Sequence, residues 1–210
     1  MLSKIFLGLF FGSMVLASEV SVVTFSGTPD SDGYQPQVTV QGAATPLQIS
    51  GVGKRTYLGI FSLYTIGSYV EDLSKMDVNH PLDSIKASKA RLLRLSMQRN
   101  MTSDEVQTAF VKALTTTGND VNIDDAGVKD VLAQVDFDVV PGDSVLLIGL
   151  PRQGNQESVT LEYFNNGNLK KTHTSTADFL SVEFWKIWFG VPVDSNMSAV
   201  QKGLFNKINR

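Results

Sequence analysis

The sequence predicts an α+β domain, because segments typical of strands and segments typical of helices occur in separate groups along the chain. Strand-like segments fill the first part, and two amphipathic helical segments follow Thr102. A second group of strand-like segments covers Ser144 to Thr174, and helices close the chain. The chain has 210 residues, of which 42% are hydrophobic, which is enough to bury the core of one domain.

The N-terminal segment Met1–Ala17 has the features of a secretory signal peptide. Lys4 supplies a positive charge, and the apolar run Ile5–Leu16 is too short to span a bilayer. We therefore expect cleavage near Ala17, a single domain over residues 18–210, and a periplasmic or secreted protein. No second apolar stretch and no cysteine for a lipid follow, so we expect no stable membrane anchor. A buried N-terminal helix or a retained anchor is the alternative.

The first group of strands is predicted from short runs of β-branched and aromatic residues between turn-rich segments. These runs are Val20–Phe25, Val38–Val40 and Leu47–Ile49. The glycines of Gly51–Gly53 are interpreted as a turn at a strand end. Residues 57–70 are dense in aromatic residues and carry two glycines, which predicts two strand segments with a bend.

The middle of the chain predicts one strand and three helices. A short helix is expected near Leu82–Ala87, and the alternating pattern of Ala90–Met97 indicates a half-buried strand. The Thr-x-x-Glu spacing of Thr102–Glu105 is a capping box, and apolar residues at helical spacing continue the helix to about Leu114. Similar spacing over Ile123–Val135 predicts a further helix.

The last part of the chain predicts a buried strand, a hairpin and two helices. The continuous apolar run within Ser144–Gly149 is typical of a fully buried strand. Ser158–Phe164 and Leu169–Thr174 flank an Asn-Asn-Gly-Asn sequence, which is a hairpin signal. Two helices close the chain, at Ala177–Phe189 and Asn196–Asn209.

Several kinds of chemistry are disfavoured by composition. Removing residues 1–17 takes away one lysine and no acidic residue, so the formal net charge changes from −3 to −4, and no basic cluster suggests nucleic acid as a partner. The chain has no cysteine, and its two histidines, His80 and His173, lie far apart without ligand-spaced neighbours. We therefore expect no metal and no cofactor. No Gly-x-Ser-x-Gly sequence offers a hydrolase nucleophile, and we expect a monomer.

Three segments, in order, resemble the chalcone isomerase superfamily and its bacterial chalcone isomerase-like branch. Residues 51–55 and 64–72 resemble the Gly-x-Gly-x-Arg and Ile-Gly-x-Tyr-Leu-Glu-Asp motifs. Phe137–Leu150 is similar to a Pro-Pro-Gly-Ser-Ser-Ile-Leu strand entry, and Phe184–Leu204 to an Ile-Trp-Leu-Gly-x-x-Pro segment. The resemblance implies an open-faced β-sandwich, which is a large antiparallel sheet with a layer of helices and a ligand cleft between them.

The resemblance also implies an activity. Chalcone isomerases are intramolecular lyases that close a 2′-hydroxychalcone to a flavanone, without a covalent nucleophile. Arg55 aligns with the catalytic arginine, whose cation would stabilise the developing enolate. Tyr64 occupies the place of a threonine that orders a water. Two other interpretations of Arg55 stay open, namely pairing with a surface carboxylate such as Glu71, or holding a ligand carboxylate without turnover.

Other aligned positions depart from the plant enzymes. Val106 and Ala113 stand where a tyrosine and an asparagine contact substrate, so two polar contacts are missing. Ile187 and Trp188 stand where residues discriminate between substrates, which predicts a more apolar cleft. The nearest polar substitutes are Gln98, Arg99 and Asn100. The alternative function is therefore a non-catalytic binder of fatty acids or other apolar carboxylates, and in either case we expect a small apolar or aromatic ligand as the partner. A third function, an envelope accessory protein with no small ligand, also stays open, because the sequence does not show whether the cleft exists.

Overall fold

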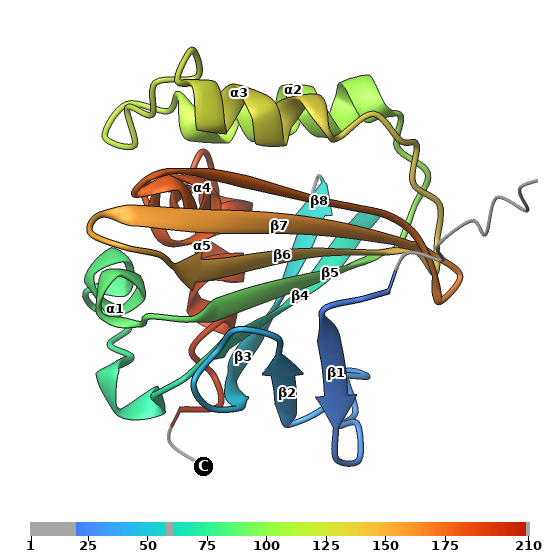
Figure 1. Cartoon of the computed structure of the whole chain (residues 1–210). Coiled ribbons are helices and arrows are strands. Elements are labelled where there is room, and N and C mark those ends of the chain that lie inside the picture. The colour runs from blue at the N-terminus through green and yellow to red at the C-terminus, as the bar shows by residue number, and fades with distance from the viewer. Residues whose placement is uncertain (1–19, 58–60, 209–210) are drawn as a thin grey trace, which may run out of the picture.

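One antiparallel sheet of eight strands organises the computed structural model, which describes residues 20–57 and 61–208 (Figure 1). Each strand pairs with its neighbours in sequence, from β1 to β8. The strands are β1 Val23–Ser26, β2 Gln37–Val40, β3 Leu47–Tyr57, β4 Phe61–Val70, β5 Arg91–Met97, β6 Ser144–Pro151, β7 Gln156–Asn165 and β8 Asn168–Asp178. The segment expected to be a signal peptide lies outside the described residues.

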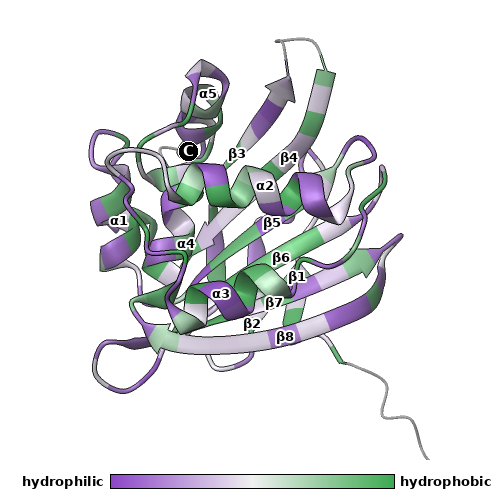
Figure 2. Cartoon of the chain, turned by 90° about the horizontal axis from the view of Figure 1, so that it is seen from above, coloured by the Kyte–Doolittle hydropathy of each residue, from purple (hydrophilic) through white to green (hydrophobic). Residues whose placement is uncertain are grey.

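Five α-helices in the described residues accompany the sheet, which confirms the prediction of an α+β fold with a large antiparallel sheet and a layer of helices. They are α1 Pro81–Ala87, α2 Ser103–Leu114, α3 Ala126–Ala133, α4 Leu180–Phe189 and α5 Ser195–Gly203, with a short 3₁₀ helix η1 at Leu73–Lys75. Figure 2 shows α2 and α3 lying across the strands, whose hydrophobic residues are visible beneath them. No helix in the described ranges is both long and apolar enough to cross a bilayer.

Three of the predicted helices have wrong boundaries. The helix expected over Ile123–Val135 spans only Ala126–Ala133, because the side chain of Asp125 caps it. For the two closing helices, long-range packing is the reason. The helix expected from Ala177 begins at Leu180, because Ala177 and Asp178 extend β8 by pairing with the start of β7. The helix expected over Asn196–Asn209 ends at Gly203, where the backbone turns against β3, and residue 209 lies outside the described residues.

The turn expected at Gly51–Gly53 is also wrong, because β3 continues through it to Tyr57. A Cβ atom on Gly51 would lie 2.3 Å from the carbonyl oxygen of Gly203, and one on Gly53 would lie 2.6 Å from that of Val200. These glycines therefore let the backbone of α5 approach the backbone of β3. The second segment expected over 57–70 is β4, and the connection at 58–60 lies outside the described residues.

Both faces of β5 and β6 are buried, which explains the continuous apolar run of β6. The expectation that Ala90–Met97 is only half-buried is wrong, because side chains on the second face of β5 are also covered. Leu93, Leu95 and Leu147 face the core between the sheet and the helices. Leu92 and Ile148 face a second core, enclosed with side chains of β2 and β3 where the sheet curls back on itself. The prediction of a fully buried strand within Ser144–Gly149 is thereby confirmed.

Helix α4 is anchored in the main core by a buried ion pair at its N-terminus. The side chains of Trp185 and Phe189 on this helix are fully buried, as expected for core packing. The guanidinium of Arg91 pairs with Glu157, and donates to the carbonyl of Ile85 at 2.8 Å. The same glutamate accepts hydrogen bonds from Ser181 Oγ at 2.7 Å and from the amide of Val182 at 3.0 Å. It therefore gives a partner to a backbone N–H in the first turn of α4 that has none within the helix.

Candidate functional site

A row of three side chains crosses the sheet beneath α2. Arg55 on β3 is the direct cross-strand partner of Tyr64 on β4, and Tyr64 is the partner of Met97 on β5. Directly paired residues of an antiparallel sheet present their side chains on the same face. The register therefore brings the arginine and the tyrosine of the sequence motifs side by side.

Helix α2 covers this row, and a capping box fixes where the helix begins. The side chain of Thr102 accepts from the amide of Glu105, and the Glu105 side chain accepts from the amide of Thr102, as the predicted capping box requires. The helix then turns Val106, Phe110 and Ala113 toward the sheet. The ring of Phe110 packs edge-on against Trp188 of α4, with the ring centres 5.8 Å apart.

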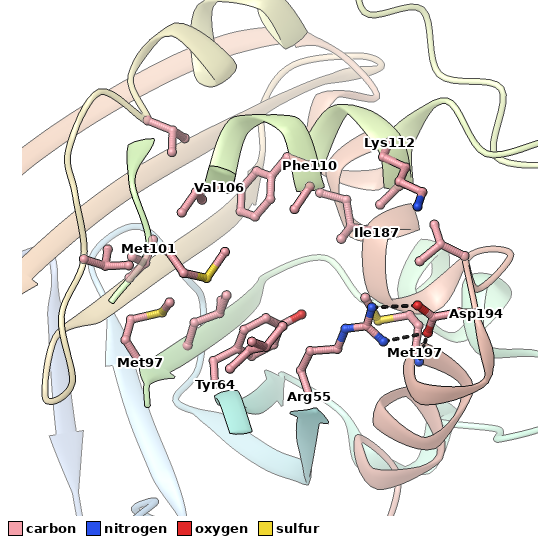
Figure 3. A pocket seen from close by; sticks show the side chains of 18 of the residues that line it. Arg55, Tyr64, Met97, Met101, Val106, Phe110, Lys112, Ile187, Asp194 and Met197 are labelled. Atoms are coloured by element: carbon pink, nitrogen blue, oxygen red, sulfur yellow. Dashed lines mark hydrogen bonds and ion pairs between the residues drawn. The ribbon is translucent and has the colours of Figure 1, made fainter. Parts of the chain in front are cut away.

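A cavity of about 220 Å³ lies between the sheet row and the helices. This volume is far more than one water requires, and it lies below the usual range of ligand pockets, so any organic ligand it encloses must be small. Fifteen of the nineteen lining residues are apolar, and the other four are Arg55, Tyr64, Lys112 and Asp194. Figure 3 shows Arg55, Asp194 and Lys112 together at one end, and Met97, Met101 and Val106 at the other. The cavity is therefore amphipathic along its length.

Arg55 is held by an ion pair with Asp194, a residue 139 positions away in sequence. Its two terminal nitrogens donate to the two carboxylate oxygens, at 2.6 and 2.8 Å. Asp194 also caps α5 by accepting from the amide of Met197 at 2.8 Å. The hydrogen bonds from Arg55 lower the pKa of Asp194 to about 2, and the same hydrogen bonds raise the pKa of Arg55. The aspartate therefore neutralises the arginine and fixes it to α5.

Tyr64 presents a hydrogen-bond donor to the cavity. Trp188 Nε1 donates to the Tyr64 hydroxyl oxygen at 3.2 Å. Because an indole N–H can only donate, the tyrosine oxygen is the acceptor, and its own proton has no acceptor among the described residues. Burial raises the pKa of Tyr64, against smaller lowering effects of Trp188 and Arg55, so the phenol stays protonated at neutral pH. Figure 3 shows this hydroxyl pointing into the cavity.

The other candidate residues lie either at the cavity or outside it. Val106, Ala113 and Ile187 line the cavity with Arg55 and Tyr64, while Trp188 is buried behind Tyr64 and acts on it through the hydrogen bond. Gln98, Arg99 and Asn100 are exposed and do not line the cavity. Gln98 and Arg99 instead border a shallow hollow beside Phe61, because β5 ends at Met97 and the chain then turns away to the start of α2. Of the polar substitutes named from the sequence, none therefore shares the cavity with Arg55.

Two charged lining residues were not among the candidates. Asp194 lies in the sequence Pro-Val-Asp of the third resembling segment, and the Asp-x-x-Met spacing before α5 is a helix-capping signal. That signal predicts the cap and does not predict the pairing with Arg55, for which Glu71 was the suggested partner. Lys112 lies on α2 one position before Ala113, where sequence alone offers no signal beyond its charge. Within the described ranges, no cluster of three metal-ligating side chains occurs.

Asp194→Asn is expected to destabilise the domain by about 1 kcal/mol at neutral pH, since the asparagine keeps the helix cap and loses the ion pair. The pKa of Asp194 is depressed in the folded state, so its contribution is present above pH ~4 and is lost as the pH falls toward about 2. Urea unfolding of both proteins from pH 7 to pH 2 should therefore give curves that converge in acid.

The control for this prediction is Asp83→Asn, which removes an exposed ion pair with Lys86 that has an N···O distance of 3.8 Å. Its effect should stay within about 0.5 kcal/mol at every pH. A difference between wild type and Asp194→Asn that does not change with pH would contradict the role of the ion pair.

The chain is similar to known proteins in sequence and in fold. The family model described as chalcone isomerase-like matches residues 29–200. A crystal structure of a fatty-acid binding protein from Arabidopsis thaliana superposes with a TM-score of 0.55 and 13% sequence identity, over 86% of this chain and 96% of that chain. At this identity the likeness concerns the fold alone. No curated protein matches the chain.

Proposed function

Because this chain belongs to the chalcone isomerase-like family, as its sequence motifs indicated, we propose that its cavity binds a small apolar molecule with one polar end, of the class of fatty acids and other apolar carboxylates. The apolar chain would lie along Met97, Met101 and Val106, and the polar end would lie at Tyr64. The proposed function is binding without turnover. If the segment 1–17 is an export signal, the ligand would come from the cell envelope or the surroundings.

The distribution of polarity along the cavity carries this proposal. The polar groups gather at one end, and the rest of the lining is aliphatic, aromatic or methionine. An apolar lining gains affinity from burying hydrocarbon, at roughly 25 cal/mol per Å² removed from water, and a few polar groups then set the orientation. An amphiphile with a single head group matches this arrangement. The fold shared with a fatty-acid binding protein supports the same interpretation.

The chemistry of the polar end favours binding over catalysis. An arginine that stabilises an enolate must offer uncompensated positive charge to the reacting oxygen. Here Asp194 faces both terminal nitrogens of Arg55. In addition, Val106 and Ala113 supply no hydrogen bond at the two positions where the isomerases hold their substrate through polar side chains. A ligand can therefore be buried, but few groups remain to select one reactive conformer.

The test is a binding measurement on protein from Ser18 onward. We expect calorimetric titration to detect decanoate, laurate or palmitate, and native mass spectrometry of freshly purified protein to show a bound lipid. Ala113→Phe should weaken binding at least tenfold, about 1.4 kcal/mol, because the ring fills part of the cavity. Ala133→Phe, at an exposed position on α3, should leave the affinity unchanged. Absence of binding, or equal binding by Ala113→Phe, would contradict the proposal.

Isomerase activity is the second candidate, and the cross-strand pair of Arg55 and Tyr64 favours it. A cation and a phenol donor at one end of an apolar cavity could stabilise an enolate if Asp194 moved away. The purified protein should then remove the enone absorbance of a 2′-hydroxychalcone and form one flavanone enantiomer. Arg55→Ala should be much slower. A rate equal to that in buffer alone would exclude this candidate.

A further inference from the structure

Lys112 is the charged residue of the cavity lining whose charge no other group in the described residues matches. It lies in the second half of α2, and it is exposed at the same end of the cavity as Arg55 and Asp194. Its ammonium group has no hydrogen bond or ion pair within the part of the chain that the structure describes. Figure 3 shows that its side chain extends from α2 on the same side of the cavity as the Arg55–Asp194 pair.

The charges at this end leave one positive charge for a ligand. Arg55 and Asp194 neutralise each other through two hydrogen bonds, at 2.6 and 2.8 Å. A ligand carboxylate placed on Arg55 would also approach the carboxylate of Asp194, and two carboxylates that share one guanidinium repel each other. Displacing Asp194 would in turn remove the cap of α5 at Met197. The arginine is therefore poorly placed to be the main partner of an anionic head group.

Lys112 has none of these restrictions. A lysine side chain is a flexible stem with a compact charge and three donors, so it can adjust to a head group at the mouth of the cavity. The Tyr64 hydroxyl, whose proton has no acceptor among the described residues, can donate to a second oxygen of the same head group. Together they provide one positive charge and one neutral donor.

We propose that Lys112 is the counter-cation of the ligand and selects a monoanionic head group, while the Arg55–Asp194 pair stays intact and holds α5. The inference rests on the proposed function of the cavity and makes it specific. A monocarboxylate is the preferred ligand. A dianionic head group is disfavoured, because its second charge would face Asp194 without a partner.

The test compares an ionised and a neutral ligand of the same chain length. Laurate and dodecanol are titrated into the wild type and into Lys112→Met, which keeps a helix-forming apolar side chain of similar length. We expect Lys112→Met to bind laurate about tenfold more weakly and dodecanol equally well, because only the charge-assisted contact is lost. Lys112→Arg should keep most of the laurate affinity. Lys202→Met removes an exposed helical lysine of α5 outside the cavity lining, and should bind both ligands as the wild type does.

The outcomes separate this inference from the proposed function. Equal laurate affinity of Lys112→Met and wild type, with strong loss in Arg55→Met, would overturn the role of Lys112 and leave the cavity as a binding site. Failure of the wild type to bind either ligand would overturn both. Loss of dodecanol binding in Lys112→Met would show a packing defect instead of a lost charge, and would also count against the inference.

Discussion

Glu157→Ala is expected to lower the free energy of unfolding by about 3–5 kcal/mol, the largest effect of any single substitution considered. The side chain of Arg91 is 2% exposed, so without Glu157 its charge would stay buried without a counter-ion. Burial already lowers the pKa of Arg91, and the charge of Glu157 is the main effect opposing that shift. The substitution also removes the acceptor of Ser181 Oγ and of the amide of Val182 at the start of α4.

Chemical denaturation at neutral pH would measure this loss of stability. Two further variants serve as controls for the buried ion pair. Glu183→Ala breaks an ion pair with Lys186 on the partly exposed side of α4, and should cost no more than about 1 kcal/mol. The double variant Arg91→Met with Glu157→Leu removes both charges, and should be more stable than Glu157→Ala alone. If Glu157→Ala and Glu183→Ala were equally stable, the buried pair would not be what anchors α4.

Gly51→Ala is expected to cost about 2–3 kcal/mol of stability and to weaken ligand binding as well. A Cβ atom at this position would lie 2.3 Å from the carbonyl oxygen of Gly203 and 2.4 Å from the carbonyl carbon of Leu204. Both are backbone atoms, so no side-chain rotation relieves the contact, and the end of α5 must move away from β3. Helix α5 carries Met197 of the cavity lining and is capped by Asp194, so the displacement reaches the site.

Two measurements on Gly51→Ala check this prediction. Its thermal and chemical unfolding are compared with those of Gln48→Ala, an exposed position of the same strand at which no change beyond about 0.5 kcal/mol is expected. Titration with laurate then shows whether the site is affected. Wild-type stability in Gly51→Ala would mean that the close contact of β3 with α5 is not needed by the fold.

Features that depend on neighbouring residues were predictable from the sequence. The capping box of Thr102 and Glu105, the hairpin around Asn166–Gly167 and the buried apolar strand within Ser144–Gly149 each rest on short-range spacing or periodicity. The motif around Arg55 and Tyr64 likewise indicated two residues that share the cavity. Short-range spacing also explains why the turn predicted at Gly51 and Gly53 is wrong. A turn and a close approach of two backbones both favour glycine, so the local sequence does not distinguish them.

By itself, the sequence determined the fold class, the family and the apolar character of the cavity, since these follow from local hydrogen bonding, the spacing of apolar residues and the motifs. Only the tertiary structure decided which charges meet. Arg55 pairs with Asp194 and not with Glu71, and Arg99 lies outside the cavity. Within the described residues, the charge of Lys112 at the polar end of the cavity has no partner. The physical reason is that a long-range ion pair depends on strand register and on how α5 packs against β3, and neither is encoded in any short segment.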